Sequence, residues 1–285
     1  MKAMSRQVLQ QKIGFAVLTF AAILVVIPIV SVIGYILWQG AGAISWEFLT
    51  AMPRSGMKEG GIFPAIVGTV LLTFGTAIAS IPLSLGAAIY LAEYARDTWL
   101  TRLVRLAIVN LAGIPSVVYG LFGLGMFVLF LNLGTALIAG SLTLGLMTLP
   151  VVISTAEEAI LSVPQSFRVV SISLGGTRWQ TIRYQVLPHA LPGILTGIIL
   201  GLERAAGETA PILFTVAAFY LPQLPRSPLD QTMALPYHLY VVSTQVPGMP
   251  LSVQYGTALV LLAFVLSLTT VATIIRSRVR RRRQW

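Results

Sequence analysis

The sequence predicts an all-α, polytopic membrane protein with six transmembrane helices and with both ends in the cytoplasm. Three observations predict this fold. Hydrophobic residues make up 56% of the 285 residues and charged residues only 10%, whereas a soluble domain usually carries about 25% charged residues. Uncharged runs recur along the chain, and each is long enough for the roughly 20 residues of one crossing. Lysine and arginine gather in alternate connections between these runs.

The first span is expected at residues 14–38, after a cytoplasmic arm of residues 1–13. A secretory signal is the alternative, because basic residues precede the run and residues 41–43 resemble a cleavage site. The apolar core of a signal is only about 7–15 residues long, and this run is longer. We therefore expect a first span that is retained.

Five further spans are expected between residues 62 and 275. The uncharged runs that predict them cover residues 61–92 for the second span, 106–156 for the third and fourth with a break near 132–134, 190–220 for the fifth, and 251–275 for the sixth. The fifth must tolerate a group of three charged residues. An even number of crossings places both ends on the same side.

Lysine and arginine decide which side, because cytoplasmic loops carry an excess of these residues. With the N-terminus inside, fifteen of the nineteen lie inside and three outside, while Arg204 lies within a span. The outside loops are then residues 39–61 and 221–250, and a short helix is expected at 233–245 within the second. The basic tail, residues 276–285, is explained by anchoring beside anionic lipid, with a specific partner site as the alternative. Because the net charge of +10 is so unevenly spread, we expect no nucleic-acid partner.

The segment 156–188 is predicted to form a cytoplasmic helical hairpin that is too polar for the bilayer. Ser166, after Pro164, is the expected N-cap of its first helix. Gly175-Gly176 supplies the turn, and Thr177 can cap the second helix. A hairpin that simply lies on the membrane surface is the alternative.

This hairpin resembles the EAA loop of the permease subunits of bacterial ABC importers. The glycine of the turn matches, and so does the ending Gln185-Val186-Leu187-Pro188, but Val169-Val170-Ser171 replaces the usual Glu-Ala-Ala. The resemblance implies a hairpin that docks on an ATPase subunit, without any ion pair that the usual glutamate would make. The residues expected to couple the two subunits are Val169, Val170, Ser171, Leu174, Gly175, Gly176, Arg178, Leu187 and Pro188.

Three further segments look like the permeases of the bacterial high-affinity phosphate (Pst) transporter. They read GGIFPAIVGT at 60–69, IPSVVYG at 114–120 and RAAGETAP at 204–211, and the last is the most specific. The length and the short N-terminal arm favour the A-type subunit. The resemblance implies a type I importer with a MetI-like core at 62–275, in the bacterial inner membrane. It implies as partners a second, C-type permease, a dimer of ATPase subunits that binds ATP and magnesium, and a periplasmic phosphate-binding protein, with no cofactor bound by this chain.

The charged group of the fifth span supports this resemblance, because ionisable residues inside a membrane are costly and usually functional. Arg204 and Glu208 are four residues apart and share a helix face, while Glu203 points about 100° away. Pro211 cannot donate a hydrogen bond, which leaves one backbone carbonyl free. The arginine fork suits a phosphate oxygen, and a carboxylate accepts from a phosphate O–H. We expect Arg204, Glu208 and Thr209 to bind substrate; a structural ion pair that sets helix register is the alternative.

The sequence offers little to an enzyme. There is no cysteine, and His189 and His238 lie on opposite sides, so neither thiolate catalysis nor a two-histidine metal site is expected. No GxxxxGK[ST] phosphate loop is present, so ATP hydrolysis is expected from a partner. Glu157 and Glu158 are expected to be solvated. Two other classes stay open: an ABC permease for another oxyanion such as molybdate or sulfate, and an integral membrane enzyme or signalling scaffold.

Overall fold

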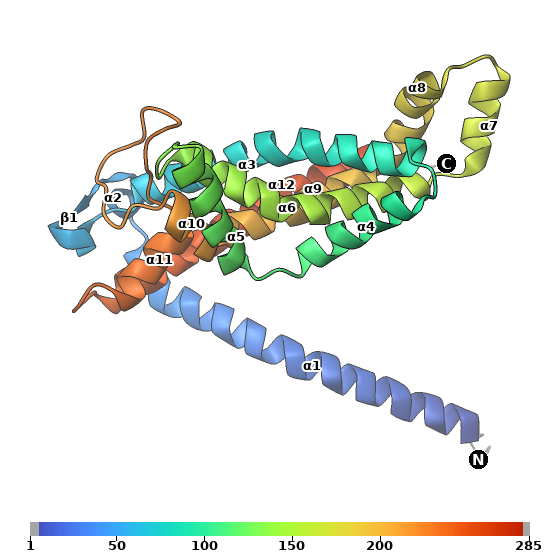
Figure 1. The fold of residues 1–285 in the computed structure, drawn as a ribbon. Coiled ribbons are helices and arrows are strands. Elements are labelled where there is room, and N and C mark those ends of the chain that lie inside the picture. The colour runs from blue at the N-terminus through green and yellow to red at the C-terminus, as the bar shows by residue number, and fades with distance from the viewer. Residues whose placement is uncertain (1–5, 282–285) are drawn as a thin grey trace.

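The computed structural model describes residues 6–281 and shows a bundle of long helices (Figure 1). Lys2 and residues 282–285, which the sequence assigns to the cytoplasmic arm and tail, lie outside the described residues. Five helical segments of the described chain are long and apolar enough to cross a membrane. They overlap α1 (Arg6–Gly40), α3 (Phe63–Ile89), α6 (Leu137–Leu161), α9 (Leu187–Gly207) and α12 (Leu251–Arg281).

The predicted third span is a bent pair of helices. α4 (Trp99–Ala112) and α5 (Ser116–Gly123), with the π-helical segment Leu124–Phe130, meet at an angle of 104°, and counted as one crossing they complete the predicted six. The bend falls at Pro115, which lacks a backbone N–H and disfavours helical conformation in the residue before it. Residues 93–105, between the second and third uncharged runs, were predicted as a short basic connection. From Trp99 onward they are helical, and Thr98 caps α4 by accepting from the N–H of Thr101.

The break that was predicted near residues 132–134 is confirmed. Asn132 and Gly134 both have positive φ, 52° and 69°, so the chain reverses there between the third and fourth spans. Glycine and asparagine adopt this left-handed conformation at lower cost than other residues.

The core lies where α3 and α9 pack against α6. Leu144, Met147 and Val152 of α6 are almost completely buried there. Gly197 and Gly201 of α9 lie against the side chains of α6, where a larger residue would collide. Small residues of this kind allow membrane helices to approach closely.

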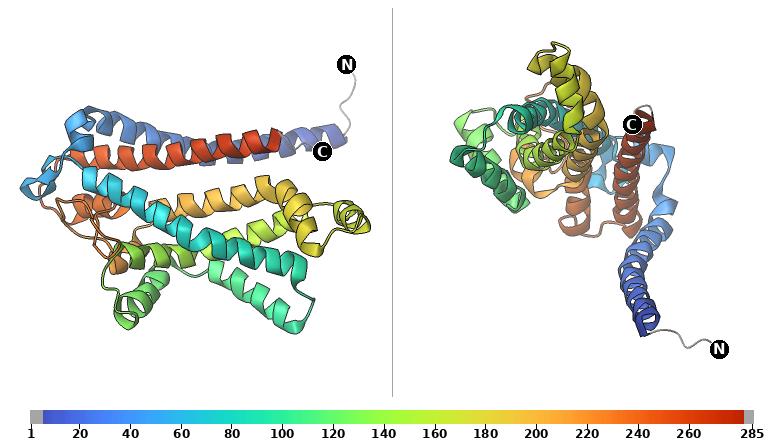
Figure 2. Two further views of the ribbon diagram at one scale, coloured as in Figure 1. Left: turned by 90° about the horizontal axis from the view of Figure 1, so that it is seen from above. Right: turned by 90° about the vertical axis from the view of Figure 1, so that its right-hand side faces the viewer.

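α1 packs against α12 and leaves the body of the bundle toward its N-terminal end (Figures 1 and 2). None of the side chains in its most apolar window is buried.

The described ends of the chain lie at the same end of the bundle as the hairpin of α7 (Gln165–Ser173) and α8 (Arg178–Thr181) (Figure 1). The even number of crossings is therefore confirmed, and the side that faces the cytoplasm remains the prediction from the arginine count. The opposite end carries short elements: η1 (Ala41–Ala43), α2 (Trp46–Thr50), β1 (Pro53–Arg54), η2 (Ser55–Met57), β2 (Glu59–Gly60), α10 (Ala210–Thr215) and α11 (Leu235–Thr244). β1 and β2 form one small antiparallel ladder.

Candidate functional site

The hairpin is built as predicted at its turn and differently at its start. Gly175 has a φ of 84°, and the hydroxyl of Thr177 accepts from the N–H of Gln180 in a capping box. The expected N-cap, Ser166, is wrong: α7 begins at Gln165, and Pro164 is its N-cap residue. Proline holds φ near the helical value, so the helix starts directly after it and Ser166 already lies in the first turn.

The hairpin presents an open apolar face. Val169, Val170 and Leu174 are 56%, 58% and 84% exposed, and a groove of about 540 Å³ runs between the two helices. The hydroxyl oxygens of Ser171 and Thr181, 2.8 Å apart, join α7 to the second helix. No other part of the described chain covers this face, so it is available to a partner.

Leu187 and Pro188, which were also expected to contact the ATPase, are half-buried at the start of α9. Leu187 packs against a cluster of buried side chains to which α3, α6 and α9 contribute. These two residues therefore set the junction between hairpin and bundle, and the other seven candidates make up the hairpin itself.

An ion pair that sequence reasoning did not anticipate holds the hairpin to the bundle. Arg168 of α7 pairs with Glu93, in the π-helical segment Tyr90–Tyr94 that follows α3, at 2.6 Å. Arg178 donates to the backbone carbonyl of Glu93, and its guanidinium lies 4.9 Å from the centre of the Tyr94 ring. The two paired residues are 75 positions apart in the chain, so no local spacing points to the contact.

Glu157 was expected to be solvated, and this is wrong. Its side chain is 13% exposed and pairs with Arg105 of α4 at 2.8 Å. Arg105 also donates to the carbonyl of Leu91 at 3.0 Å. Arg105 lies in α4, and the packing of α4 against α6 brings it to Glu157. Glu158, on the next face of α6, is exposed as expected.

The predicted substrate residues lie at a break in the fifth span. Arg204, in the last turn of α9, donates to the Glu208 carboxylate at 3.3 Å, and their side chains are 40% and 18% exposed. Glu208 has an extended backbone, with φ −77° and ψ 134°, and Thr209 precedes α10. The expected continuous helix is therefore wrong here. The Pro211 ring would collide with the carbonyl four residues earlier, so α9 ends at Gly207 and the proline enters the first turn of α10.

The surroundings of this pair are partly closed. Glu208 borders a cavity of about 10 Å³ together with Thr69 and Thr73 of α3, which is room for about one water molecule. The Oε1 atom of Glu203 is buried without a hydrogen-bond partner among the described residues. Arg204 itself is open on one side, so this chain alone supplies only part of an enclosed site.

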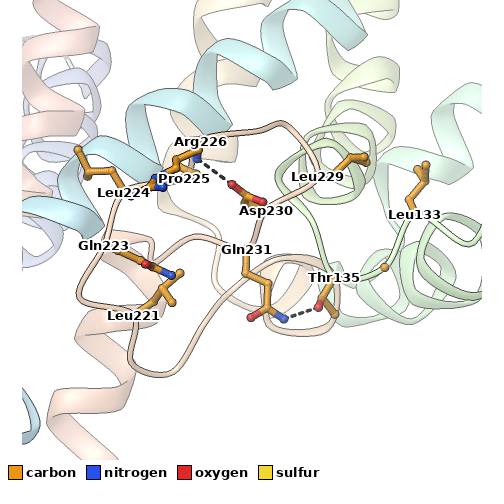
Figure 3. A pocket seen from close by; sticks show the side chains of 11 residues that line it. Leu133, Thr135, Leu221, Gln223, Leu224, Pro225, Arg226, Leu229, Asp230 and Gln231 are labelled. Atoms are coloured by element: carbon orange, nitrogen blue, oxygen red, sulfur yellow. Dashed lines mark hydrogen bonds between the residues drawn. The ribbon is translucent and has the colours of Figure 1, made fainter.

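The outer end carries a separate polar pocket of about 650 Å³ (Figure 3). The connection 133–135 and the loop 221–231 line it. The Asp230 carboxylate accepts from the backbone N–H groups of Arg226 and Ser227, at 2.8 and 2.9 Å, and the Gln231 amide donates to the Thr135 hydroxyl (Figure 3). The first two bonds shape the loop itself, and the third joins it to the connection between the third and fourth spans.

The short helix that was expected at 233–245 is confirmed as α11, in the loop outside the spans. Tyr237 stacks on Tyr240 with ring centres 6.2 Å apart. His238 is 2% exposed, and burial lowers its pKa to about 4, so the ring is neutral near neutral pH. Among the described residues, no group of three or more histidines and carboxylates could hold a metal ion.

Comparisons with known proteins agree with this geometry. Residues 80–284 match the model of a family described as binding-protein-dependent transport system inner membrane component. The probable ABC transporter permease protein YqgI of Bacillus subtilis is 34% identical, and the aligned region covers 82% of this chain and 83% of YqgI. The probable phosphate transport system permease protein PstA of Methanocaldococcus jannaschii is 32% identical over 92% of each chain.

A solved structure shares the fold. A chain of a bacterial ABC transporter involved in the import of the acidic polysaccharide alginate superimposes with a TM-score of 0.64 at 15% identity, covering 95% of this chain and 98% of that chain. At this identity the likeness concerns the fold alone.

Proposed function

We infer the function of this chain from its family, since it belongs to the binding-protein-dependent transport system inner membrane components. It is a multi-pass inner-membrane permease of an ABC importer, a transport component rather than an enzyme. Its fold is the type I importer fold with the predicted MetI-like core. The alternative of an integral membrane enzyme or signalling scaffold loses its support.

We propose that the transported substrate is inorganic phosphate. The Arg204–Glu208 pair at the end of α9 carries this proposal, because it offers an open guanidinium beside a carboxylate. The guanidinium can bind phosphate oxygens through two parallel N–H groups. Glu208 can accept from the O–H of monohydrogen phosphate, which fully ionised sulfate lacks. The similarity to a probable phosphate permease over nearly the whole chain supports the same substrate.

The partners follow from the surfaces that this chain leaves open. The open face of the hairpin docks on one subunit of an ATPase dimer, which binds ATP and magnesium, and this chain binds no cofactor. A second, homologous permease covers the exposed side of Arg204 and completes the path. The outer loops meet a periplasmic phosphate-binding protein, and lipid surrounds α1, whose apolar side chains are exposed.

In this mechanism Arg204 attracts the anion after its release from the binding protein. Its guanidinium stays protonated at every physiological pH, so the positive charge is always present. Glu208 both orients the guanidinium and selects a protonated oxyanion, and the Thr209 hydroxyl, at the start of α10, supplies a further hydrogen bond. One arginine from each permease at this position binds weakly enough to let the ion leave, as passage through a channel or carrier requires.

The test uses the whole complex reconstituted in vesicles, with uptake of radioactive phosphate driven by ATP. Arg204→Gln should abolish uptake while the complex still assembles. Arg102→Gln is the matched control, because Arg102 pairs with Asp97 on the surface and both side chains are more than 70% exposed. Normal uptake by Arg204→Gln would refute the site, and failure to assemble would favour the structural ion pair.

Selectivity is a second readout. Glu208→Gln should make sulfate a stronger competitor of phosphate uptake, because the amide can donate to a fully ionised oxygen. An importer of another oxyanion would show uptake of sulfate or molybdate by the unaltered complex and none of phosphate.

A further inference from the structure

Arg276 does not extend from the bundle as part of a basic anchor. Its Nη1 donates to the hydroxyl of Thr196 on α9 at 3.2 Å, and the residue is half-buried. No carboxylate of the described residues forms an ion pair with it. A cation that is half-buried among membrane helices without a counter-charge is costly, and such residues usually mark an ion path.

Thr196 lies on the face of α9 that carries Arg204. Thr196, Leu200 and Arg204 follow one another at intervals of four residues, and each step turns by about 40°, so they form a stripe that drifts by about 80° along one side of the helix. Leu200 is 49% exposed and the Arg204 side chain 40%, so the described chain leaves this side open. At 1.5 Å per residue, Thr196 lies about 12 Å from Arg204, toward the hairpin.

The same rise places Thr196 inside the bundle. It comes nine residues after Leu187, the first residue of α9, which is about 13 Å from the hairpin end of that helix. The guanidinium of Arg276 therefore lies between Arg204 and the predicted cytoplasmic end, along the direction in which an imported ion would travel.

The hydroxyl of Thr196 explains how the guanidinium is positioned. It donates to the carbonyl of Pro192 at 2.9 Å, which turns an oxygen lone pair toward Arg276. A guanidinium has five N–H donors, and Arg276 uses one of them here. The remaining donors and the full positive charge stay available to an anion.

We propose that Arg276, positioned by Thr196, is a second binding station for a phosphate oxyanion, on the exit side of Arg204. This inference rests on the proposed function. The anion passes from one guanidinium to the next along a single face of α9, so that neither site has to hold it strongly. Arg276 contacts the ion, and Thr196 acts only through Arg276.

Uptake kinetics test the station in the reconstituted complex. Arg276→Gln should lower the maximal rate of phosphate uptake about tenfold, and it should leave the half-saturating external concentration unchanged, because capture occurs upstream. A loss of packing alone would instead lower the amount of complex. Arg278→Gln is the matched control, since Arg278 is exposed two residues further along α12 and about 200° around the helix. Equal rates for the two variants would overturn the proposal.

Two milder variants keep the test decisive if Arg276→Gln fails to assemble. Arg276→Lys keeps the charge and loses the fork, and Thr196→Val keeps the shape and loses the hydroxyl. Each should lower the maximal rate two- to fivefold with a normal yield of complex. Unchanged rates in both would overturn the proposal.

A lipid headgroup is the other source of a phosphate oxyanion for Arg276. The measurements are therefore made in vesicles of phosphatidylcholine alone and in vesicles that also contain phosphatidylglycerol. The rate ratio between Arg276→Gln and Arg278→Gln should be the same in both. A difference that appears only with the anionic lipid would overturn the transit station. Absence of phosphate uptake by the unaltered complex would instead reject the proposed function itself.

Discussion

Arg168 of α7 donates two hydrogen bonds, from Nε at 3.0 Å and from Nη2 at 2.6 Å, to the same oxygen of Glu93. The same guanidinium donates to the carbonyl of Ile160, in the last turn of α6, and to that of Val163, two residues after the helix. One arginine therefore joins the hairpin to the ends of two membrane helices. A movement of the hairpin would be passed directly to α3 and α6.

Removal of one partner of this pair should weaken that connection strongly. The side chains of Arg168 and Glu93 are only 11% and 8% exposed, and an unpaired buried charge costs about 3–5 kcal/mol. Glu93→Gln should therefore lower the thermal stability of the complex and the phosphate transported per ATP. The double variant Glu93→Gln with Arg168→Met should recover part of the stability, because no unpaired charge remains. If the loss of stability in the double variant equals the sum of the losses in the two single variants, the pairing is contradicted.

The turn of the hairpin should require a residue that tolerates positive φ. Gly175→Val should uncouple ATP hydrolysis from uptake, because its φ of 84° is strained by about 1–3 kcal/mol for a β-branched residue. Gly175→Asn should be milder, since asparagine enters this region more readily. Ser173→Val, two residues earlier and exposed, is the control. The measurement is the ratio of phosphate imported to ATP hydrolysed, and normal coupling in Gly175→Val would refute docking through this turn.

His238 should make the outer end sensitive to acid. Its folded pKa of about 4 lies below the ordinary value of 6.5, so unfolding takes up a proton as the pH falls. The contribution of the neutral, buried His238 ring to the free energy of unfolding is complete above pH 6.5. It is lost progressively as the pH falls toward 4, by up to about 3 kcal/mol. Hydrogen exchange of α11 should therefore accelerate between these values. His238→Leu should remove that pH dependence, and exchange that stays pH-sensitive in this variant would contradict the assignment to His238.

The orientation in the membrane can be tested because the chain contains no cysteine. Cysteine at Gln223, in the outer loop, should react with an impermeant thiol reagent added from the periplasm. Cysteine at Ser173, in the hairpin, should react only after the membrane is opened. Both positions are exposed. The reverse pattern would overturn the orientation inferred from the lysine and arginine count and would place the hairpin outside the cytoplasm.

The number of crossings, the turn of the hairpin and the cap of its second helix could all be predicted from the amino-acid sequence. All three depend on local chemistry: apolar length sets a span, and the positive φ at Gly175 and the cap at Thr177 are properties of a few neighbouring residues. The pairing of Arg204 with Glu208 was also within reach, because the two residues are only four positions apart.

Which distant polar groups meet depends instead on how the helices pack. Arg168 with Glu93, Arg105 with Glu157 and Arg276 with Thr196 are separated by 75, 52 and 80 positions, and no periodic pattern relates them. Their contacts depend on how α3, α4, α6, α9 and α12 pack, and that packing is set by close-fitting small residues such as Gly197 and Gly201.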